Sequence, residues 1–393
     1  MARQLHVKRV FSDGTSEPID AFANPGVYKT DLDTSTVGTY EVTLSCTGEK
    51  SSKVPLIIQV SVCDVQENDD FTYISNGNIA EILSYKGESE NIVIPEEIDG
   101  AIVVGGSVFD GTDYKTISKP KGWRYFYSIP LFQSCKKLEE IVVDPDNEYY
   151  SSKDGVLFDK NQETLWRFPI NKQSDEYSIP DTVTSLVQGS FFNCVGVKKV
   201  IIPKSVTEIN KSLRWAIMPF ENSEEPGSLE EIEVEEGNPI FKSMDGVLFM
   251  DYQVWDEDIG QNGDYRRIYE MICYPTAKKD QSYRIPDGVT YAIDMNCNPN
   301  LKELVVPSSM KYWGYNPVKH MDGLSVYFEL EDFIWDRNTN EGWRVAADII
   351  EDSIEGTIYV RNSVMREKII ELLKDEYGSR YNDYWTVSDN YEW

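Results

Sequence analysis

The stretch VTSLVQGSFFNCVGVKKVIIPKSVTEI, at Val183–Ile209, decides the fold of this 393-residue chain. Its central motif is an aliphatic residue and a proline, with another apolar residue three positions after the proline, as in Ile202-Pro203 and Val206. The motif returns at Ile94-Pro95 with Ile98, Ile179-Pro180 with Val183, Ile285-Pro286 with Val289, and Val306-Pro307 with Met310. Neighbouring copies are 23 residues apart (179 to 202) or 21 residues apart (285 to 306), which is the coil length of a repeat solenoid.

Longer blocks of sequence also repeat. Leu138–Val143 reads LEEIVV and Leu229–Val234 reads LEEIEV, an offset of 91 residues. The pentapeptide DGVLF occurs at Asp154–Phe158 and again at Asp245–Phe249, with the same offset. Because Asp-Gly favours tight turns with positive φ and Val-Leu-Phe favours strands, DGVLF predicts a structural hairpin rather than an active site.

The offset between the copies then increases from 91 to 106 residues, as Ile179 and Ile285 show. An insertion of 15 residues therefore lies between Phe249 and Pro275 in the second copy. We read the chain from about residue 130 to 310 as two copies of one composite unit.

Within each coil the pattern LxxIxI alternates as a short strand does, so its apolar positions should face inward. These positions are Leu138, Ile141, Val143, Val197, Val200, Ile202, Leu229, Ile232, Val234, Leu301, Leu304 and Val306. Three cysteines lie three or four residues before such strands, and Met321 takes this place before Leu324; the cysteines are Cys135, Cys194 and Cys297. Since free cysteine is among the most buried residue types, these positions predict structural thiols rather than disulfides or catalysis.

Val183–Ile209, Leu138–Phe158 and Leu229–Phe249 resemble the leucine-rich repeats of the BspA-like family of bacterial surface proteins. The tail Gly356–Trp385 is similar to the closing segment of that family, which implies a strand and then an amphipathic helix that caps the solenoid. The apolar residues expected on this helix are Val364, Ile369, Leu372 and Leu373.

Residues 1–66 follow a different pattern, with period-two alternation and turn signals at Asp13-Gly14, Gly38 and Gly48. DTSTVGTYEVTLSC, at Asp33–Cys46, is similar to a bacterial immunoglobulin-like domain, although the strand that usually precedes LHVKRV is missing. We therefore predict a mainly β chain with two domains. Residues 1–66 form an immunoglobulin-like β-sandwich, truncated or atypical at its start, and residues 67–393 form a leucine-rich-repeat solenoid of short parallel strands with a strand-helix cap at about 356–393.

Composition argues against several kinds of function. The formal net charge is −29, with 38 Lys+Arg and 67 Asp+Glu, which disfavours binding to nucleic acid or to an anionic membrane. No run of 18 apolar residues predicts a membrane span. The two histidines, His6 and His320, form no metal-binding motif, and no phosphate-binding glycine loop is present, so we expect no metal, no cofactor and no enzymatic activity.

Departures from the repeat are the candidate binding sites, because insertions in solenoids often carry function. The interval from the motif to the next strand is 14 residues in Val183–Val197, but 40 in Ile98–Leu138 and 23 in Val206–Leu229. The candidate residues in the insertions are Trp123, Arg124, Tyr125, Tyr127, Trp215, Tyr252 and Trp255. Outward strand positions form a second candidate surface, made of Val142, Ile201, Glu233 and Val305. The alternatives are that the aromatic rings pack on the solenoid flank and that β-propensity explains the outward apolar residues.

The sequence thus predicts a non-enzymatic recognition or adhesion protein, extracellular or at the cell surface, that binds a protein or glycan partner. One alternative is a glycan-acting hydrolase with a carboxylate pair, and another is a passive spacer that displays other domains. The start MARQLHVKRVFSDG has no apolar signal core, which indicates either a cytoplasmic chain or a piece of a longer secreted one. The oligomeric state is left open.

Overall fold

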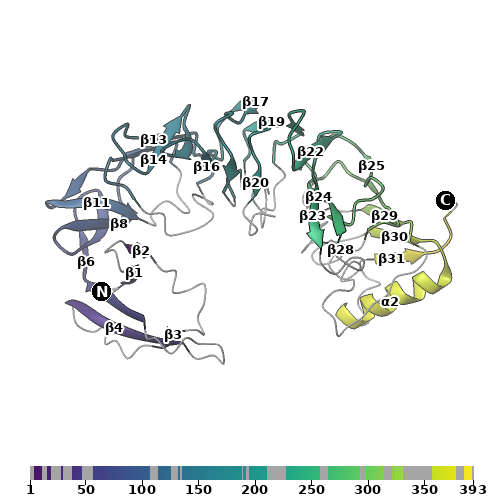
Figure 1. Ribbon diagram of the computed structural model, residues 1–393, viewed down its shortest axis with the longest axis horizontal. Helices are drawn as coiled ribbons and strands as arrows, with labels where there is room; N and C mark the ends of the chain where they lie inside the picture. The colour runs from purple at the N-terminus through teal and green to yellow at the C-terminus, as the bar shows by residue number, and fades with distance from the viewer. Residues whose placement is uncertain are drawn as a thin grey trace. The chain divides into compact units, whose positions relative to one another are not determined.

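The computed structural model contains two compact units, Met1–Lys160 and Asn161–Trp393, whose strands and helix are labelled in Figure 1. Strands make up 46% of the chain and helix 5%, so the fold is mainly β, as predicted. The structure describes residues 4–10, 16–18, 28–29, 38–46, 56–106, 114–124, 132, 135–187, 189–191, 194–209, 227–256, 264–292, 295, 298–310, 312–313, 321, 323–330, 356–377 and 385–391. The division at Lys160 does not address the boundary predicted at residue 66, which stays a prediction.

The first unit begins with a five-stranded antiparallel sheet in the order β2-β1-β5-β4-β3. Its strands are β1 (Gln4–Val10), β2 (Ser16–Pro18), β3 (Tyr28–Lys29), β4 (Gly38–Cys46) and β5 (Leu56–Cys63). The alternating segments of the sequence do form strands here. The described part of residues 1–66 forms one sheet, so the two-sheet immunoglobulin-like sandwich stays a prediction.

A mixed five-stranded sheet follows in the order β10-β11-β8-β7-β6. Its strands are β6 (Val65–Glu67), β7 (Phe71–Ser75), β8 (Ile79–Tyr85), β10 (Glu97–Ile98) and β11 (Ala101–Gly106). Tyr73, Ile82 and Val103 are fully buried and form part of its core.

Parallel strands one coil apart make the first ladder of the solenoid pattern. β9 (Asn91–Val93), β12 (Thr116–Lys119) and β13 (Glu140–Val143) pair in register, so that Ile92, Ile117 and Ile141 lie side by side. All three isoleucines are buried. The inward position of Ile141 is therefore confirmed.

The coil that contains β12 lies within the interval that the sequence suggested was a 40-residue insertion, and that interpretation was wrong for residues 114–124. Lys119 and Trp123 stand where other coils carry an isoleucine and a valine, and both are buried. The Lys119 amine lies 4.6 Å from the centroid of the Trp123 ring and 5.0 Å from that of Phe132. Burial lowers the pKa of this amine well below its usual value.

The second unit starts with two parallel sheets whose registers repeat every 23 residues. β17 (Ser174–Ser178), β19 (Val197–Ile202) and β21 (Glu231–Val234) form one sheet, in which Ser174 pairs with Val197. β16 (Thr164–Arg167), β18 (Ser185–Leu186) and β20 (Glu208–Ile209) form the other, in which Ser185 pairs with Glu208. Each coil therefore contributes one strand to each sheet, and the apolar side chains of both strands face the interior.

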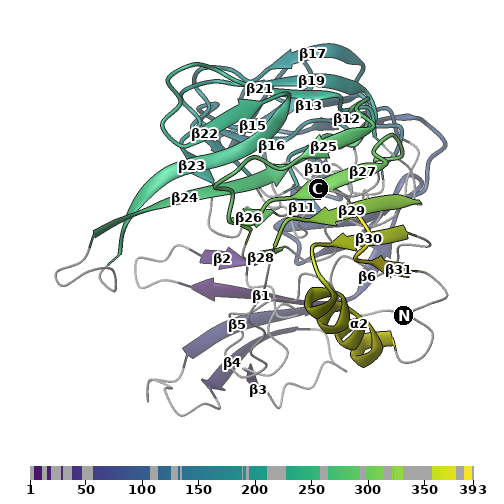
Figure 2. The ribbon, with the colours of Figure 1, turned by 90° about the vertical axis from the view of Figure 1, so that its right-hand side faces the viewer.

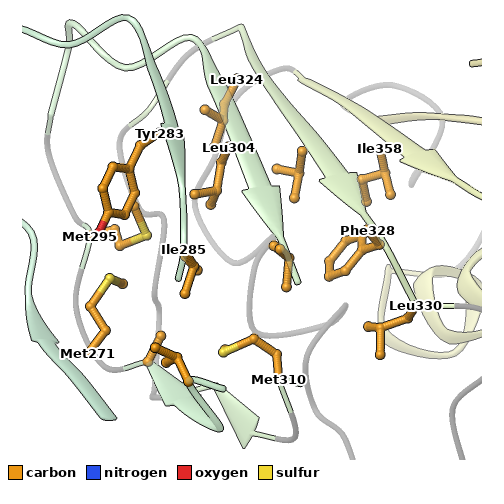
Figure 3. Close-up of a cluster of buried hydrophobic side chains, with 14 of the residues drawn as sticks. Met271, Tyr283, Ile285, Met295, Leu304, Met310, Leu324, Phe328, Leu330 and Ile358 are labelled. Atoms are coloured by element: carbon orange, nitrogen blue, oxygen red, sulfur yellow. The ribbon is translucent and has the colours of Figure 1, made fainter. Parts of the chain in front are cut away.

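The same arrangement continues at the C-terminal end of this unit. β25 (Ser282–Arg284), β27 (Glu303–Val306), β29 (Leu324–Phe328), β30 (Gly356–Val360) and β31 (Trp385–Ser388) form a five-stranded parallel sheet, here called the C-terminal sheet. β24 (Asp264–Cys273), β26 (Tyr291–Ala292) and β28 (Tyr312–Trp313) lie in the other sheet. Figure 3 shows Leu304, Phe328 and Ile358 from the first sheet facing a core that also holds Met271 and Met310.

The predicted strand-helix ending is present as β30 and α2 (Ser363–Tyr377), and α2 lies beside β30 and β31 (Figure 2). The Asn362 side chain accepts a hydrogen bond of 2.9 Å from the backbone N–H of Met365 and so caps the first turn. Met365 and Ile369 are buried, whereas Val364, which the sequence pattern placed on the apolar face, is 57% exposed. The apolar stripe is therefore rotated by one residue, because Met365 rather than Val364 leads into the core.

Both DGVLF copies form two-residue hairpins, as predicted. β14 (Tyr150–Lys153) pairs with β15 (Val156–Asp159), and β22 (Phe241–Met244) pairs with β23 (Val247–Asp256). Asp154 and Gly155 have φ of 50° and 75°, and Asp245 and Gly246 have 51° and 76°. Two consecutive positive φ values are the geometry for which Asp-Gly is favoured.

Each hairpin covers the edge of a parallel strand. The N–H of Ile141 in β13 donates to the Gly155 carbonyl over 2.9 Å, and the N–H of Ile232 in β21 donates to the Gly246 carbonyl over 2.9 Å. In each copy a second N–H of the strand donates to a serine hydroxyl of the hairpin over 2.9 Å. The repeated pentapeptide thus ends a run of parallel strands by satisfying its outermost backbone donors.

Buried asparagines join successive coils at the proline turns. The Asn238 amide donates to the carbonyls of Pro203 and Val206 over 3.0 Å each, and its side-chain oxygen accepts two backbone N–H groups. Asn147 and Asn298 make four equivalent hydrogen bonds in their own coils. These side chains supply partners to backbone groups that the turns would otherwise bury unpaired.

The coil cysteines that the structure describes are buried and free, as predicted. Cys135 and Cys194 are both buried thiols, and Met321 occupies the equivalent buried place. Burial raises the pKa of the Cys194 thiol to about 12. Cys297 lies outside the described residues.

Candidate functional site

The outward residues of the parallel strands form the candidate surface, because alternate side chains of a strand point to opposite faces. In the sheet β17-β19-β21, Ile201 pairs with Ser178 on one side and Glu233 on the other. Ile201 is half-buried and Glu233 is exposed. Lys199 lies 2.6 Å from the Glu233 carboxylate and 3.0 Å from that of Glu231, and these hydrogen bonds raise its pKa. This part of the surface is a network of ion pairs.

The sheet of the first unit presents a more apolar surface. Val142 on β13 is 36% exposed, and across Ser118 on β12 its row continues to Val93 on β9, which is 72% exposed. The row is therefore two valines separated by a serine. Its area is small, and scattered apolar residues of this size are ordinary on protein surfaces.

The C-terminal sheet carries the most aromatic part of the surface. Val305, an outward position predicted from the sequence, is half-buried and pairs with Arg284 on one neighbouring strand and Tyr327 on the other. Tyr327 in turn pairs with Tyr359 on β30. The row across the sheet is therefore arginine, valine, tyrosine and tyrosine.

The tyrosines of this row stack on one another. The ring centroids of Tyr327 and Tyr359 are 4.6 Å apart and the rings are almost parallel, at 7°. Tyr391, which follows β31, packs at a tilt against both, with centroid distances of 4.6 Å to Tyr327 and 5.4 Å to Tyr359. Tyr391 is 42% exposed, so its ring offers area to a ligand. These three residues are called the tyrosine platform below.

Charges around the tyrosine platform are mostly paired or negative. Arg284 donates to the Glu329 carboxylate over 2.6 Å and to the Asp287 carboxylate over 2.9 Å. Burial raises the pKa of the Tyr327 phenol, and the carboxylate of Glu303 on the adjacent strand raises it further. The phenol therefore stays neutral at physiological pH.

The residues of the predicted aromatic insertions fall in different environments. The Trp123 ring is fully buried against Lys119, so it serves packing and offers no surface to a partner. Arg124 is exposed, and its guanidinium lies 5.6 Å from the centroid of the Tyr149 ring. Tyr125, Tyr127 and Trp215 lie outside the described residues.

The 15-residue insertion lengthens a hairpin, as its composition suggested. β23 and β24 pair over their whole length (Figure 2), with Trp255 opposite Tyr265. Tyr252 is half-buried and Tyr265 is 62% exposed. Asp251, at the base of the insertion, accepts hydrogen bonds from Arg267 over 2.6 and 2.9 Å, which hold its pKa at about 2. The described side chains of this hairpin are thus tied by an ion pair and expose one tyrosine.

The described residues offer little for metal or hydrolytic chemistry. Among them, no three His, Cys, Asp or Glu side chains gather closely enough to hold a metal ion. A glycosidase needs one carboxyl group whose pKa is raised so that it can donate a proton. The carboxyls of Asp175 and Asp251 show the opposite shift, since Lys198 lowers the pKa of the first and Arg267 that of the second.

The tyrosine platform is the feature that sequence reasoning missed. Tyr327 and Tyr359 were within reach of the repeat pattern, because each lies one position after an inward residue, Val326 or Ile358, of its strand. Extending the outward row from Val305 through the last two strands would have found them. Tyr391 gives no such signal, since it lies beyond the last strand.

Comparison with known proteins identifies part of this architecture. Residues 168–236 match the model of the BspA type leucine rich repeat region, with six copies. The resemblance seen in the sequence is thereby confirmed for this region, and over the rest of the chain it stays a prediction. No curated protein matches the chain, and no described helix is long and apolar enough to span a membrane.

Three solved structures show a limited likeness. A leucine rich cell surface protein from Faecalibacterium prausnitzii A2-165 is 19% identical, with 68% of this chain and 76% of that one covered and a TM-score of 0.37. The pneumococcal vaccine antigen PcpA is 14% identical, with 83% and 98% covered and a TM-score of 0.33. A leucine-rich repeat protein from Eubacterium ventriosum ATCC 27560 is 14% identical, with 63% and 61% covered and a TM-score of 0.30. All three TM-scores are below 0.5, so these likenesses do not establish the fold or function of this chain.

Proposed function

We propose, starting from the BspA-type leucine-rich-repeat region at residues 168–236, that this chain is a non-enzymatic recognition protein at the cell surface or outside the cell. Its partner is a protein or a glycan. The partner binds the outward face of the parallel strands, together with the exposed side chains of the aromatic insertions. Repeat solenoids present such extended strand faces for binding.

The tyrosine platform is the observation that carries this proposal. Tyr327 and Tyr359 stand on the outward side of strands whose inward side chains already fill the core, so their rings are not needed to close it. Tyrosine gives a large contact area and a hydroxyl group at a low entropic cost, which is why it is enriched in binding surfaces. Simple strand propensity would be met equally well by threonine or valine at these positions.

Binding of the intact chain to a glycan array and to a panel of extracellular proteins tests the proposal. The informative variant is the double change Tyr327→Ser with Tyr359→Ser, and its matched control is Tyr265→Ser on the hairpin β23–β24. We expect the double variant to lose at least about tenfold in affinity, since each ring contributes about 1 kcal/mol, and the control to bind normally. No binding of the intact chain to either panel would refute the recognition function and favour a passive spacer.

The first aromatic insertion requires point substitutions. A deletion of residues 113–130 would remove β12 and the buried Trp123, so lost binding would only report a damaged fold. The double change Tyr125→Ser with Tyr127→Ser leaves β12 in place and asks whether this segment contacts the partner. Unchanged affinity of this variant would restrict binding to the strand faces.

The surface location and the absence of catalysis are tested separately. Antibody labelling of intact cells should detect the protein, and labelling that appears only after lysis would contradict the surface location. Incubation with a panel of polysaccharides should release no reducing ends. Release that an acid-to-amide substitution abolishes would establish the hydrolase alternative instead.

A further inference from the structure

We propose that the outward face of the C-terminal sheet binds a linear, uncharged glycan that runs across the five strands. This inference rests on the proposed function and names its ligand class. The tyrosine platform packs against the sugar rings, and a row of hydroxyl groups beside it hydrogen-bonds to the sugar hydroxyls.

Two rows of side chains cross this face in register. The first row consists of Arg284, Val305, Tyr327, Tyr359 and Ser388. The second row, two residues earlier on each strand, consists of Ser282, Glu303, Ser325, Thr357 and Thr386. Four of the five residues in the second row carry a hydroxyl group. An aromatic row and a hydroxyl row thus run side by side, perpendicular to the strands.

The spacing of the rows suits a chain of sugar rings. Neighbouring strands lie about 4.8 Å apart, so five strands span about 19 Å. One pyranose ring advances a linear glycan by nearly the same distance as one strand advances the sheet. A glycan that lies across the strands therefore meets a new side chain of each row at every ring.

The chemistry of the face suits neutral sugars. The C–H groups on the flat side of a pyranose pack on aromatic rings, and Tyr391 leaves 42% of its surface open for that contact. The Ser325 hydroxyl already hydrogen-bonds to Tyr327, which orients the phenol toward the hydroxyl row. Hydroxyl and carboxylate groups are the partners that sugar hydroxyls require.

Charge disfavours acidic glycans at this face. Arg284 is neutralised by two carboxylates, those of Glu329 at 2.6 Å and Asp287 at 2.9 Å. Glu303 adds a further negative charge beside Tyr327. Uronic acids or sulfated sugars would therefore meet net repulsion, in a chain whose formal charge is already −29.

A peptide partner fits the face less well. Peptide hot spots are apolar anchors set in desolvated pockets. The outward positions of the described strands in this sheet include one aliphatic side chain, Val305, and it lies in a row of polar and aromatic neighbours. The face is flat and hydroxyl-rich, which favours the glycan.

Titration of the full chain with defined oligosaccharides tests the inference. The probes are neutral linear hexasaccharides of glucose, mannose and xylose, with hexagalacturonate as the acidic counterpart and decaproline as the peptide counterpart. We expect at least one neutral probe to bind, with affinity that rises with chain length to about five sugar units and is then constant, because the face spans about 19 Å. Hexagalacturonate should bind at least about tenfold more weakly than the best neutral probe.

Variants locate the site. Tyr391→Ala removes an exposed ring after the last strand and should weaken neutral-glycan binding about fivefold to tenfold, without changing the far-ultraviolet circular dichroism. Thr357→Val removes one hydroxyl of the second row and should weaken binding by a smaller factor. Tyr265→Ala is the matched control and should bind as the parent chain does.

The outcomes separate this inference from the proposed function. Binding of an extracellular protein without binding of any neutral oligosaccharide would overturn the inference and leave the proposed function standing. Tighter binding of hexagalacturonate or decaproline, or equal losses in Tyr391→Ala and Tyr265→Ala, would also overturn it. No binding of any probe, glycan or protein would overturn both.

Discussion

Replacing Asn238 by alanine should destabilise the second unit more than most single substitutions do. The Asn238 amide donates to the carbonyls of Pro203 and Val206, and its oxygen accepts the N–H groups of Ile240 at 3.0 Å and Phe241 at 2.8 Å. Alanine removes all four hydrogen bonds and leaves these backbone groups without that partner. At about 1 kcal/mol for each net hydrogen bond, the expected loss is about 4 kcal/mol.

Thermal unfolding followed by circular dichroism measures this loss. For a unit of this size, 1 kcal/mol lowers Tm by about 2–4 °C, so Asn238→Ala should lower it by about 10 °C. Asn300→Ala is the matched control, since the Asn300 side chain donates one hydrogen bond, of 3.1 Å to Lys278, and should lose about 1 kcal/mol. An equal change in Tm for the two variants would refute the role given to the buried asparagines.

The variant Asn238→Asp adds a second test of the same reasoning. A carboxylate keeps the two accepted hydrogen bonds but loses both donors and faces two carbonyl oxygens. The folded state should therefore raise the pKa of this aspartate above its unfolded value of about 3.9. Relative to the parent chain at each pH, Asn238→Asp should be least stable above the folded pKa and should recover as the pH falls through it. A stability difference that does not change between pH 7 and pH 4 would contradict this.

Four other expectations follow from the structure. Gly246→Ala should destabilise more than Gly237→Ala in thermal unfolding, because both have positive φ but a Cβ at Gly246 would lie 3.0 Å from a neighbouring side chain, whereas Gly237 faces open space. The pKa of Asp251 is held at about 2, so its contribution to stability should be present above pH 4 and lost as the pH falls toward 2, and Asp251→Asn should remove this part of the pH dependence. The Cys194 thiol, with a pKa of about 12, should resist maleimide at pH 8 until the protein unfolds, as peptide mapping by mass spectrometry would show. Lys119→Met should raise Tm at pH 7, because burial lowers the pKa of Lys119 and the penalty on its charged form is released only as the pH rises; a lower Tm would mean that its contacts with Trp123 outweigh that penalty.

Sequence periodicity predicted the regular coils because their inward side chains are aliphatic and their prolines are regularly spaced. Ile141 and Val200 lie where the pattern put them. The coil of β12 escaped the same reasoning since Lys119 and Trp123 replace the expected aliphatic residues. A lysine in a core position is tolerated there because two aromatic rings cover it, and that compensation involves the distant Phe132.

The candidate surface was harder to predict than the fold. An aromatic residue in the sequence indicates either a core or a contact surface, and register decides between them. Trp123 takes the valine position of a proline turn and is buried, whereas Tyr359 takes an outward strand position and is half-exposed. The pairing of strands one coil apart brings Tyr327 and Tyr359 together, and no local motif announces that contact.

The hairpins that follow β13 and β21 let the protein lengthen in finished segments. Each segment brings its own end, so duplication of the corresponding gene fragment adds coils without leaving a bare strand for another molecule to zip onto. The 91-residue echo in the sequence is the trace expected of such a duplication. Relatives that grew or shrank by whole segments would keep their solubility, while a change that cut a segment before its hairpin would create an aggregating chain.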